Sequence, residues 1–458
     1  MTSDTFSASE KNDSKASLLP ETESQHGLQE SECKNASFLG AVFNLSTTIV
    51  GAGIMGLPAT MKILGLVPGI SLIVLVGILT YASIEILLRF SRACKVSSYG
   101  GVMGDAFGPL GRVVLQICII INTLGILIVY MIIIGDVVSG TSANGMHHFG
   151  ILEEWFGVCW WTGRPVTLFL TTIFILVPLV SFRHVDSLKV TSALSVALSV
   201  LFVMITACIL ILKLLSGNIN MPRLLPKVVD QTSLWKLFTA VPVLITSYLC
   251  HFNVHPIHRE LKTSSQIQAI VKASLTLCGA IYITTSLFGY TLFGDQTMDD
   301  VLANFDRNLG VPYSNILNDI VRISYAVHLM LVFPVINFSL RLNLDGLIFP
   351  LGRPISSDIR RFVFITTGLV VIIFFGAVVI PSIWVALQFT GATAAVCVSF
   401  IFPGAIALRD THGISTRIDK FIALFMIILG GISCSIALYS DIDQLSKKSS
   451  IVPTTPTS

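Results

Sequence analysis

The sequence predicts an all-α integral membrane protein with about eleven transmembrane helices. Only 12% of its 458 residues are charged and 53% are hydrophobic, whereas soluble domains carry about 25% charged residues. The hydrophobic residues gather in segments of about 20, which is the length that crosses a bilayer core as a helix. Clusters of Gly, Pro and charged residues separate these segments. The chain is therefore expected to fold in a lipid bilayer.

Eleven hydrophobic segments follow one another between two polar tails. Residues 1–36 are rich in Ser and acidic residues and are expected to form a disordered tail. Residues 441–458 form a short polar tail at the other end of the chain. The predicted spans are 38–65, 69–91, 111–136, 165–182, 190–215, 236–256, 268–293, 316–340, 360–380, 382–408 and 417–440.

The basic residues predict which way the chain crosses the membrane. Loops on the N-terminal side carry more Lys and Arg than the opposite loops, and such an excess marks the cytosolic side. The N-terminus is therefore expected in the cytosol, and eleven spans place the C-terminus on the lumenal or extracellular side. The net charge of +3 is small and the charges lie in loops, so nucleic acid is excluded as a partner.

The first span is interrupted by Gly51, Gly53, Gly56 and Pro58. Each glycine weakens a helix by about 1 kcal/mol relative to alanine, and proline weakens it further. In a bilayer, the backbone groups that such a break frees are tolerated only where they are buried in protein or line a cavity. The break is therefore interpreted as a ligand site. Close helix packing through small residues is the alternative.

The same glycines match the Gly-x-Gly-x-x-Gly spacing of dinucleotide-binding loops. That fingerprint needs a preceding strand and an acidic residue about 20 residues further on, whereas here it lies inside a hydrophobic span and the next acid is Glu85. The chain has no P-loop or HExxH motif, and its nine cysteines show neither CxxC nor metal-site spacing. We therefore predict no enzymatic activity, no cofactor and no metal.

The sixth span contains a second interruption. Between Val241 and Glu260, two prolines flank a stretch of Ser, Tyr, Cys, His and Asn within an otherwise apolar run. Interrupted helices at corresponding positions of two halves indicate an inverted repeat with a central binding site. Residues 38–215 and 236–408 would then be the two repeats of five helices, and 417–440 an extra helix.

Three motifs resemble one family of membrane proteins. The segment from Phe43 to Leu57, Phe-Asn-Leu-Ser followed by Ile-Val-Gly-x-Gly-Ile-x-Gly-Leu, resembles the first-helix signature of the amino acid/auxin permease family, notably its sodium-coupled neutral amino acid transporters. The segment from Cys250 to Leu261 is similar to the sixth-helix motif, and Arg322 with Pro334 is similar to the eighth helix. The resemblance covers residues 37–440, and the branch it suggests is the plant vacuolar amino acid transporters.

This resemblance implies an eleven-helix transporter domain with a LeuT-type 5+5 inverted repeat, broken helices one and six, and an amino acid bound between them. It implies secondary active transport by alternating access. Where the sodium-coupled branch has Asn and Thr ligands, this chain has Thr47, Met330 and Val332. A hard cation prefers oxygen ligands, so we expect protons, or no coupling ion, rather than sodium.

Two alternatives remain open from the sequence. The same site could belong to an amino acid receptor that signals without net flux, or to a transporter of auxin or another small carboxylate. The membrane is expected to be vacuolar or another endomembrane, with the plasma membrane as the alternative.

The candidate residues fall into three groups. For His251 and His328, a histidine held by a backbone partner is the alternative to a proton relay, and for Tyr248 it is ordinary packing. The substrate-binding candidates are Thr48, Gly51, Ala52, Gly53, Ile54, Ser247, Tyr248, His251 and Asn253. The coupling or proton-relay candidates are Thr47, His328 and His251, and the cavity-lining candidates are Asn122, Tyr130 and Ser324.

Arg322 lies in the eighth span, three residues after Asp319. Residues at this spacing are neighbours on a helix surface. A structural ion pair between them is therefore favoured over contact with the substrate.

Overall fold

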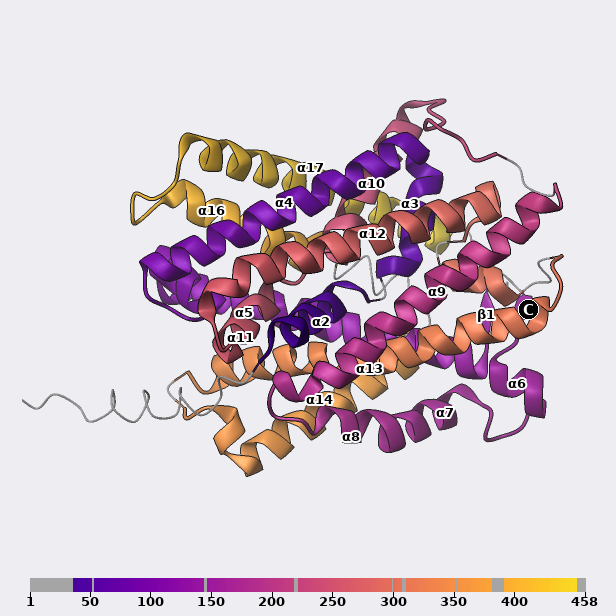
Figure 1. The fold of residues 1–458 in the computed structure, drawn as a ribbon, viewed down its shortest axis with the longest axis horizontal. Helices are drawn as coiled ribbons and strands as arrows, with labels where there is room; N and C mark the ends of the chain where they lie inside the picture. Colours follow the sequence, from indigo (N-terminus) through magenta and orange to yellow (C-terminus); the bar gives the residue numbers. More distant parts are fainter. Residues whose placement is uncertain are drawn as a thin grey trace, which may run out of the picture.

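The computed structural model describes residues 36–51, 53–143, 146–217, 221–298, 300–306, 310–350, 352–380 and 391–450. Within these ranges, long helices run side by side along the longest axis of the molecule (Figure 1). Eight are long and apolar enough to cross a membrane, and a bent pair makes nine. Two shorter apolar stretches cover Arg164–Val180 and Thr393–Arg409. The helical membrane class is confirmed, and the count of eleven spans stays a prediction.

The first half of the chain contains the bent pair and the spans that follow it. A two-stranded antiparallel hairpin of β1 (Thr141–Ala143) and β2 (Met146–His148) follows the third span and corrects the all-α prediction at this loop. The π-helix η1 (Thr172–Leu176) joins two short helices, and the 3₁₀ turn η2 (Asp186–Leu188) precedes the last helix of this half. The helices are α2 (Phe38–Ile49), α3 (Gly53–Leu64), α4 (Leu66–Ala93), α5 (Tyr99–Ser139), α6 (Ile151–Phe156), α7 (Arg164–Thr171), α8 (Val177–Val180) and α9 (Lys189–Leu215).

The second half repeats the pattern of an interrupted helix followed by long ones. Its helices are α10 (Gln231–Ser247), α11 (His251–Glu260), α12 (Ile267–Phe293), α13 (Ser314–Ile348), α14 (Ile359–Val379), α16 (Phe402–Arg409) and α17 (Arg417–Ser450). Short 3₁₀ turns are η3 (Ser264–Gln266), η4 (Gly294–Gln296), η5 (Val301–Asp306) and η6 (Ile355–Ser357), and two π-helical stretches, η7 (Gly391–Ala395) and η8 (Cys397–Ile401), lead into α16.

Helix α5 is longer than the predicted third span because a second helical stretch precedes it. The chain turns sharply at Gly108, whose φ is 72°. Glycine adopts such a positive φ readily, whereas other residues rarely do. Pro109 follows, and proline is well suited to the start of a helix. The first stretch begins at Tyr99, where the Ser98 side chain accepts a hydrogen bond from the Gly101 N–H at 3.1 Å. The kink lets the chain change direction before it enters the bundle.

The helices pack around a core that is mostly apolar. Helix α13 lies against α5 and α9, and α2 lies against α9 and α12. Large apolar side chains are also exposed on the outside, among them Phe174, Phe364 and Phe421, which are 73%, 81% and 72% exposed. In water such exposure would be costly, whereas lipid tails provide an apolar environment for it. The exposed surface therefore agrees with a multi-pass membrane protein.

The start of the described chain is attached to the end of α11. The Ala36 N–H donates to the Glu260 carbonyl at 3.0 Å, and Ala36 and Leu261 form a parallel bridge. The Glu260 carboxylate accepts hydrogen bonds from the N–H groups of Val185 and Asp186 at 3.1 and 2.7 Å. The predicted disordered tail is therefore corrected at Ala36, and its first 35 residues lie outside the described residues. We call this end of the bundle the N-terminal end.

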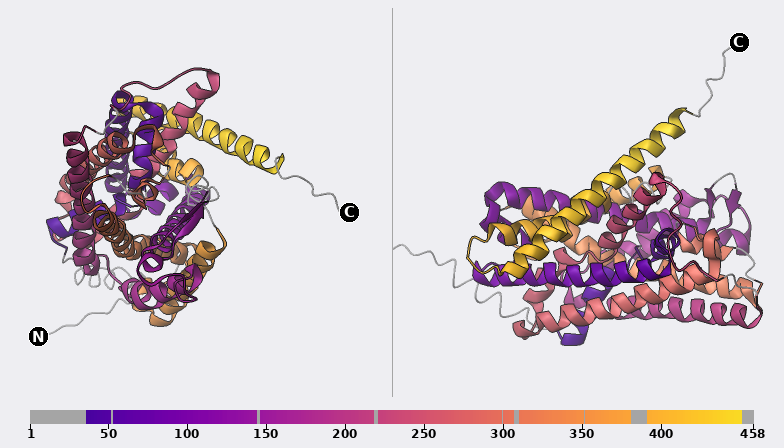
Figure 2. Two further views of the ribbon diagram at one scale, coloured as in Figure 1. Left: turned by 90° about the vertical axis from the view of Figure 1, so that its right-hand side faces the viewer. Right: turned by 90° about the horizontal axis from the view of Figure 1, so that it is seen from above.

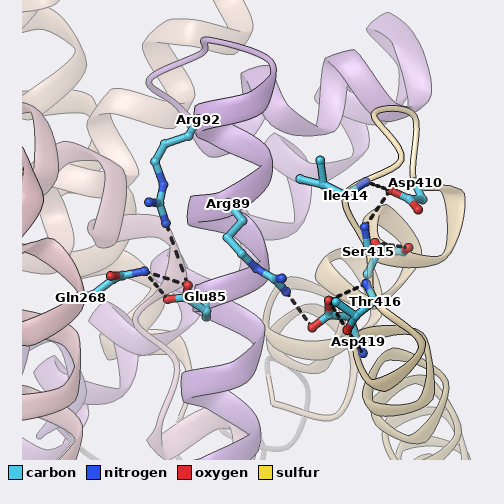
Figure 3. A network of polar contacts seen from close by, with 10 residues as sticks. Glu85, Arg89, Arg92, Gln268, Asp410, Ile414, Ser415, Thr416 and Asp419 are labelled. Atoms are coloured by element: carbon cyan, nitrogen blue, oxygen red, sulfur yellow. Dashed lines mark hydrogen bonds and ion pairs between the residues drawn. The ribbon is translucent and has the colours of Figure 1, made fainter.

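A polar network ties α4 to α12 and α17 at the same end (Figure 3). The Arg89 guanidinium pairs with the Asp419 carboxylate at 2.7 Å, and the Gln268 amide donates to the Glu85 carboxylate at 2.7 Å. From there α17 runs obliquely across the bundle and away from it (Figure 2). It reaches Ser450, so residues 441–450 of the predicted polar tail are helical.

Candidate functional site

The predicted break of the first span is present. Helix α2 ends at Ile49, Val50 and Gly51 are non-helical, and α3 begins at Gly53 with its axis bent by 55° from that of α2. Val50 is fully buried. Ala52, a predicted substrate contact, lies outside the described residues. The freed backbone groups therefore lie in the protein interior, as the bilayer requires.

The sixth span is interrupted as well. Helix α10 ends at Ser247 and α11 begins at His251, while the two flanking prolines, Pro242 and Pro256, lie inside the helices. Tyr248, Leu249 and Cys250 between them are buried. Both predicted interruptions are thus at buried positions of the bundle.

The two breaks touch each other at Gly53 and Ser247. A Cβ atom on Gly53 would lie only 2.9 Å from the Ser247 Cβ atom and 3.0 Å from its Cα atom. Real Cβ atoms essentially never approach so closely. Glycine is therefore required here because only a residue without a side chain lets the start of α3 lie against the end of α10.

Three successive carbonyl groups of the first break face polar atoms of buried side chains. Tyr282 Oη donates to the Ile49 carbonyl at 2.6 Å, and Tyr325 Oη donates to the Gly51 carbonyl at 2.9 Å. Between them, His328 Nε2 lies 3.2 Å from the Val50 carbonyl. Since an unpaired buried carbonyl is costly, helices α12 and α13 stabilise the unwound conformation through these three side chains.

Tyr282 connects the two breaks directly. Its hydroxyl oxygen lies 2.6 Å from the Ile49 carbonyl and 2.7 Å from the Ser247 carbonyl. A tyrosine hydroxyl carries a single proton, so the two carbonyls share one donor. The side chain is fully buried, and its position therefore depends on both half-helices at once.

Polar side chains also join α2, α11 and α13. The Asn253 amide donates to Thr48 Oγ1 at 2.8 Å, and Thr48 Oγ1 donates to the Asn44 carbonyl at 3.0 Å. The Ser339 hydroxyl donates to the Asn253 Oδ1 atom. Thr48 and Asn253, two predicted substrate contacts, are therefore brought together by the fold, and Ser339 is a neighbour that the sequence analysis missed.

His328 lies between the first break and α9. Its Nδ1 atom is 2.8 Å from the Ser195 carbonyl and 2.9 Å from the Ser195 hydroxyl, while Nε2 faces Val50. The ring stacks on Tyr325 with 5.3 Å between centroids. Both ring nitrogens thus lie close to backbone carbonyl oxygens, which is the alternative to a proton relay given above for this histidine. His328 also contacts the first break directly.

His251 begins α11 and faces α4. Its Nε2 atom lies 2.8 Å from the Ser83 hydroxyl, which donates to the Ser399 carbonyl at 2.5 Å. One turn further on, His255 is buried and stacks on Tyr99 at 6.3 Å. Within the described residues, His251 Nδ1 and both nitrogens of His255 have no hydrogen-bond partner. Buried polar atoms of this kind are rare and call for an explanation.

The remaining polar candidates lie on helices around the first break. Thr47 Oγ1 donates to the Ser192 carbonyl at 3.0 Å, and the Ser324 hydroxyl donates to the Val321 carbonyl at 2.9 Å. Tyr130 faces Gly51, where a Cβ atom would lie 3.0 Å from the Tyr130 Cζ atom. Asn122 is fully buried, and neither of its polar side-chain atoms has a partner among the described residues.

Tyr248 packs against α4 and α12. Its ring packs edge-on against Tyr282 with 5.0 Å between centroids, and its hydroxyl approaches Gly77 of α4 and Gly279 of α12. Ile54, another predicted contact, is fully buried at the start of α3. The position of Tyr248 favours the packing interpretation for this residue.

Arg322 pairs with a different partner from the one expected. Its Nη1 atom lies 2.8 Å from the Glu154 carboxylate of α6, and its Nη2 atom donates to the Phe149 carbonyl. Asp319 instead accepts a hydrogen bond from Trp155 Nε1 at 3.3 Å. A structural role is thus supported, but the ion pair with Asp319 is not formed, because the loop after β2 folds back onto α13.

Removing the Tyr282 hydroxyl with a Tyr282→Phe change is expected to lower both stability and amino acid affinity. Two buried carbonyls would lose their shared donor, and an unsatisfied buried group costs about 1–3 kcal/mol. We expect a lower melting temperature and about a tenfold weaker half-saturation, since about 1.4 kcal/mol corresponds to a factor of ten. Thermal unfolding and uptake of labelled amino acids would measure both.

Tyr439→Phe is a matched control, because Tyr439 is 75% exposed on α17. It should leave both quantities unchanged. Unaltered stability and affinity in Tyr282→Phe would show that the hydroxyl does not hold the two breaks together.

Solved transporters share this arrangement of helices. A mutant of the manganese transporter of Eremococcus coleocola is similar with a TM-score of 0.58 at 12% identity, covering 95% of this chain and 91% of that one. MhsT in complex with L-phenylalanine has a TM-score of 0.54 at 15% identity, covering 89% and 99%. At these identities the likeness shows the fold alone. It confirms the LeuT-type transporter fold predicted from the sequence.

The chain belongs to the family of transmembrane amino acid transporter proteins, whose family model matches residues 34–442. It is 58% identical over 439 residues to amino acid transporter AVT6A of Arabidopsis thaliana, covering 95% of both chains. The chain is therefore an amino acid transporter and not an enzyme, and the amino acid/auxin permease resemblance is confirmed.

Proposed function

We propose that this chain is a proton-coupled secondary active transporter that moves amino acids by alternating access. The observation that carries the proposal is the contact of the two helix breaks at buried depth, where Gly53 lies against Ser247. Binding sites of secondary transporters form where discontinuous helices meet near the bilayer midplane. A substrate placed there contacts both half-helices, so its binding can change the conformation of each.

The start of α3 is the proposed site for the substrate carboxylate. The first N–H groups of a helix lack intrahelical partners, and the positive end of the helix dipole attracts an anion. The Gly51 carbonyl accepts from Tyr325, the Ile49 carbonyl shares the Tyr282 hydroxyl with Ser247, and the Val50 carbonyl faces His328. The Ile54 N–H already donates to the Gly51 carbonyl at 3.2 Å, so the neighbouring N–H groups at the start of α3 are the part of this break that suits an anion.

Asn253 and Thr48 are the proposed side-chain contacts beside this site. Their hydrogen bond joins α11 to α2, and each carries polar atoms that an amino acid can bind. Ser247 lies against the start of α3 at Gly53. These three residues come from both broken spans, which is the arrangement that lets one ligand hold two half-helices together.

Protons are the proposed coupling ion. Histidine titrates near neutral pH, and His328 contacts the Val50 carbonyl in the break while also contacting Ser195 of α9. The neighbouring positions Met330 and Val332 are buried and offer a thioether and a methyl group, which suit sodium poorly. Thr47 already donates its hydroxyl to Ser192.

His251 and His255 extend the proposed proton path toward the N-terminal end of the bundle. They lie one helical turn apart on α11, and Ser83 contacts the first of them. Their unpartnered nitrogens within the described residues are suited to exchange protons with water that enters during transport.

The two halves are proposed to be inverted repeats of residues 38–215 and 236–408. Corresponding helices pack on each other in pairs: α4 on α12, α5 on α13 and α7 on α14. The proposed membrane is vacuolar, with the N-terminal end facing the cytosol, supported by the similarity to the plant vacuolar branch and by the basic loops.

Uptake into proteoliposomes tests the proposal. The purified protein would be supplied with a mixed pool of labelled amino acids under an imposed pH gradient, with and without sodium. We expect uptake that follows the pH gradient and does not need sodium. An uncoupler that collapses the gradient should abolish accumulation, which distinguishes coupled transport from leakage.

Two other results would redirect the proposal. Uptake that strictly needs sodium would show that protons are not the coupling ion. Saturable binding without flux would favour the receptor, and uptake of an auxin-type acid that amino acids do not compete away would favour the small-carboxylate carrier.

A further inference from the structure

Three side chains of the kinds that ligate metals meet at the N-terminal end of the bundle. They are Cys94, which follows α4, Asp105 in the first stretch of α5, and His412 in the loop between α16 and α17. One ligand atom from each, a sulfur, a carboxylate oxygen and a ring nitrogen, lies within 4.8 Å of the other two. The His412 Nε2 and Asp105 Oδ2 atoms are 2.8 Å apart. Three separate segments thus converge on one point.

The segments are held in place by their own contacts. The Cys94 N–H donates to the Phe90 carbonyl at 2.9 Å and ends α4. In the loop that carries His412, the Asp410 carboxylate accepts hydrogen bonds from the N–H groups of Ile414 and Ser415 at 2.8 and 3.1 Å (Figure 3). The cluster therefore lies between a helix end and a loop whose backbone conformation is fixed.

The donor set has the chemistry of a zinc site. Zinc takes cysteine sulfur at about 2.3 Å and histidine nitrogen or carboxylate oxygen at about 2.0–2.2 Å. A tetrahedron with these bonds has edges of about 3.3–3.6 Å. The sulfur therefore needs to approach by little more than about 1 Å, whereas the His412 and Asp105 atoms, which are 2.8 Å apart, must separate by about 0.5 Å. A soft thiolate beside an imidazole also selects zinc over magnesium or calcium.

We propose that Cys94, Asp105 and His412 bind a zinc ion at the N-terminal end of the transporter. Asp105 and His412 are exposed and Cys94 is half-buried, so the ion can enter from solvent and water can complete its coordination. With a thiolate and a carboxylate, the ligands carry two negative charges that balance the ion. The sequence offers no sign of this site because His412 lies 307 residues from Asp105 along the chain.

Binding is expected to depend on pH. Burial, together with the nearby Asp105 carboxylate, raises the pKa of the Cys94 thiol. Zinc binds the thiolate, so it must displace a proton. Affinity is therefore expected to increase as pH rises and to fall as pH drops, when the thiol keeps its proton.

The bound ion would join the end of α4 to the loop before α17. This consequence, unlike the site itself, rests on the proposed function. Alternating access requires helices to move relative to one another, and a cross-link between the end of α4 and the α16–α17 loop restrains that motion. Zinc on this side of the membrane is expected to slow transport.

Titration of the purified full chain with Zn²⁺ and Co²⁺ tests the site. We expect one Zn²⁺ per chain and, with Co²⁺, a thiolate-to-metal charge-transfer absorption band. Cys94→Ser should abolish the band, and His412→Asn and Asp105→Asn should each weaken binding at least tenfold. Cys159→Ser is the matched control, because Cys159 is an exposed cysteine outside the cluster, and it should keep the band.

Two results would overturn the site: no charge-transfer band in the wild-type chain, or a band that survives in Cys94→Ser. Melting temperatures of the variants would show that each is folded. In proteoliposomes, Zn²⁺ should inhibit the wild type and the Cys159→Ser control but not Cys94→Ser. Tight binding with an unchanged uptake rate would overturn the restraint on transport and leave the metal site standing.

Discussion

Gly53→Ala is expected to abolish amino acid uptake. Its Cβ atom would lie 2.9 Å from the Ser247 Cβ atom and 3.0 Å from the Ser247 Cα atom. Neither neighbour is the flexible end of a side chain, so α3 and α10 must move apart. That movement opens the contact between the two breaks, and a displacement of about 1 Å at a binding site can cost about a hundredfold in rate. Uptake into proteoliposomes at matched protein levels would measure the loss.

The control for this change is Gly368→Ala on α14. A Cβ atom there meets nothing within 4 Å, and alanine is the better helix former, so uptake should be preserved. Gly53→Leu should be at least as damaging as Gly53→Ala. Near-normal uptake in Gly53→Ala would show that the approach of Gly53 to Ser247 does not define the site.

His328→Gln is expected to separate proton coupling from amino acid binding. Glutamine can still donate to the Val50 carbonyl, which His328 Nε2 faces at 3.2 Å, but it has no proton to exchange near neutral pH. We expect loss of accumulation driven by a pH gradient, while exchange of labelled for unlabelled amino acid across the membrane persists. The two assays can be run on the same proteoliposomes.

His184→Gln serves as the matched histidine control, because His184 is exposed in the loop before η2. It should retain both activities. If His328→Gln still accumulates amino acids against a gradient, the proton passes elsewhere, and His251 becomes the residue to change next. If both accumulation and exchange disappear, His328 acts in holding the break rather than in coupling.

The sequence predicted the parts of the fold that depend on composition and on local chain chemistry. Helices in lipid need long apolar runs, and the breaks need glycine and polar residues, so both are visible without a structure. Thr48 and Asn253 are both candidates because the two breaks are expected to face each other, but their hydrogen bond is visible only in the structure. The end of α17 was missed because a polar surface does not prevent a helix from continuing beyond the membrane.

The parts that were not predicted depend on tertiary contacts. Tyr282 and Tyr325 lie in ordinary-looking apolar spans, and only the fold reveals that their hydroxyls reach the carbonyls of the first break. One signal was available: a tyrosine deep in a membrane span needs a hydrogen-bond partner for its hydroxyl. Arg322 was assigned to the nearest acid in sequence, whereas the chain brings Glu154 to it from a distant loop.

The hydroxyl shared between the two breaks leaves the site with fewer donors than acceptors. At any instant Tyr282 can donate to the Ile49 carbonyl or to the Ser247 carbonyl, so one of the two carbonyls always lacks this donor. The ammonium group of an amino acid carries three N–H donors, as a lysine ammonium does, and can supply what the protein lacks. A ligand that brings a carboxylate but no amine would leave this deficit in place. We therefore expect the site to favour amino acids over acids that lack an amine, because only the ammonium group supplies the missing donor.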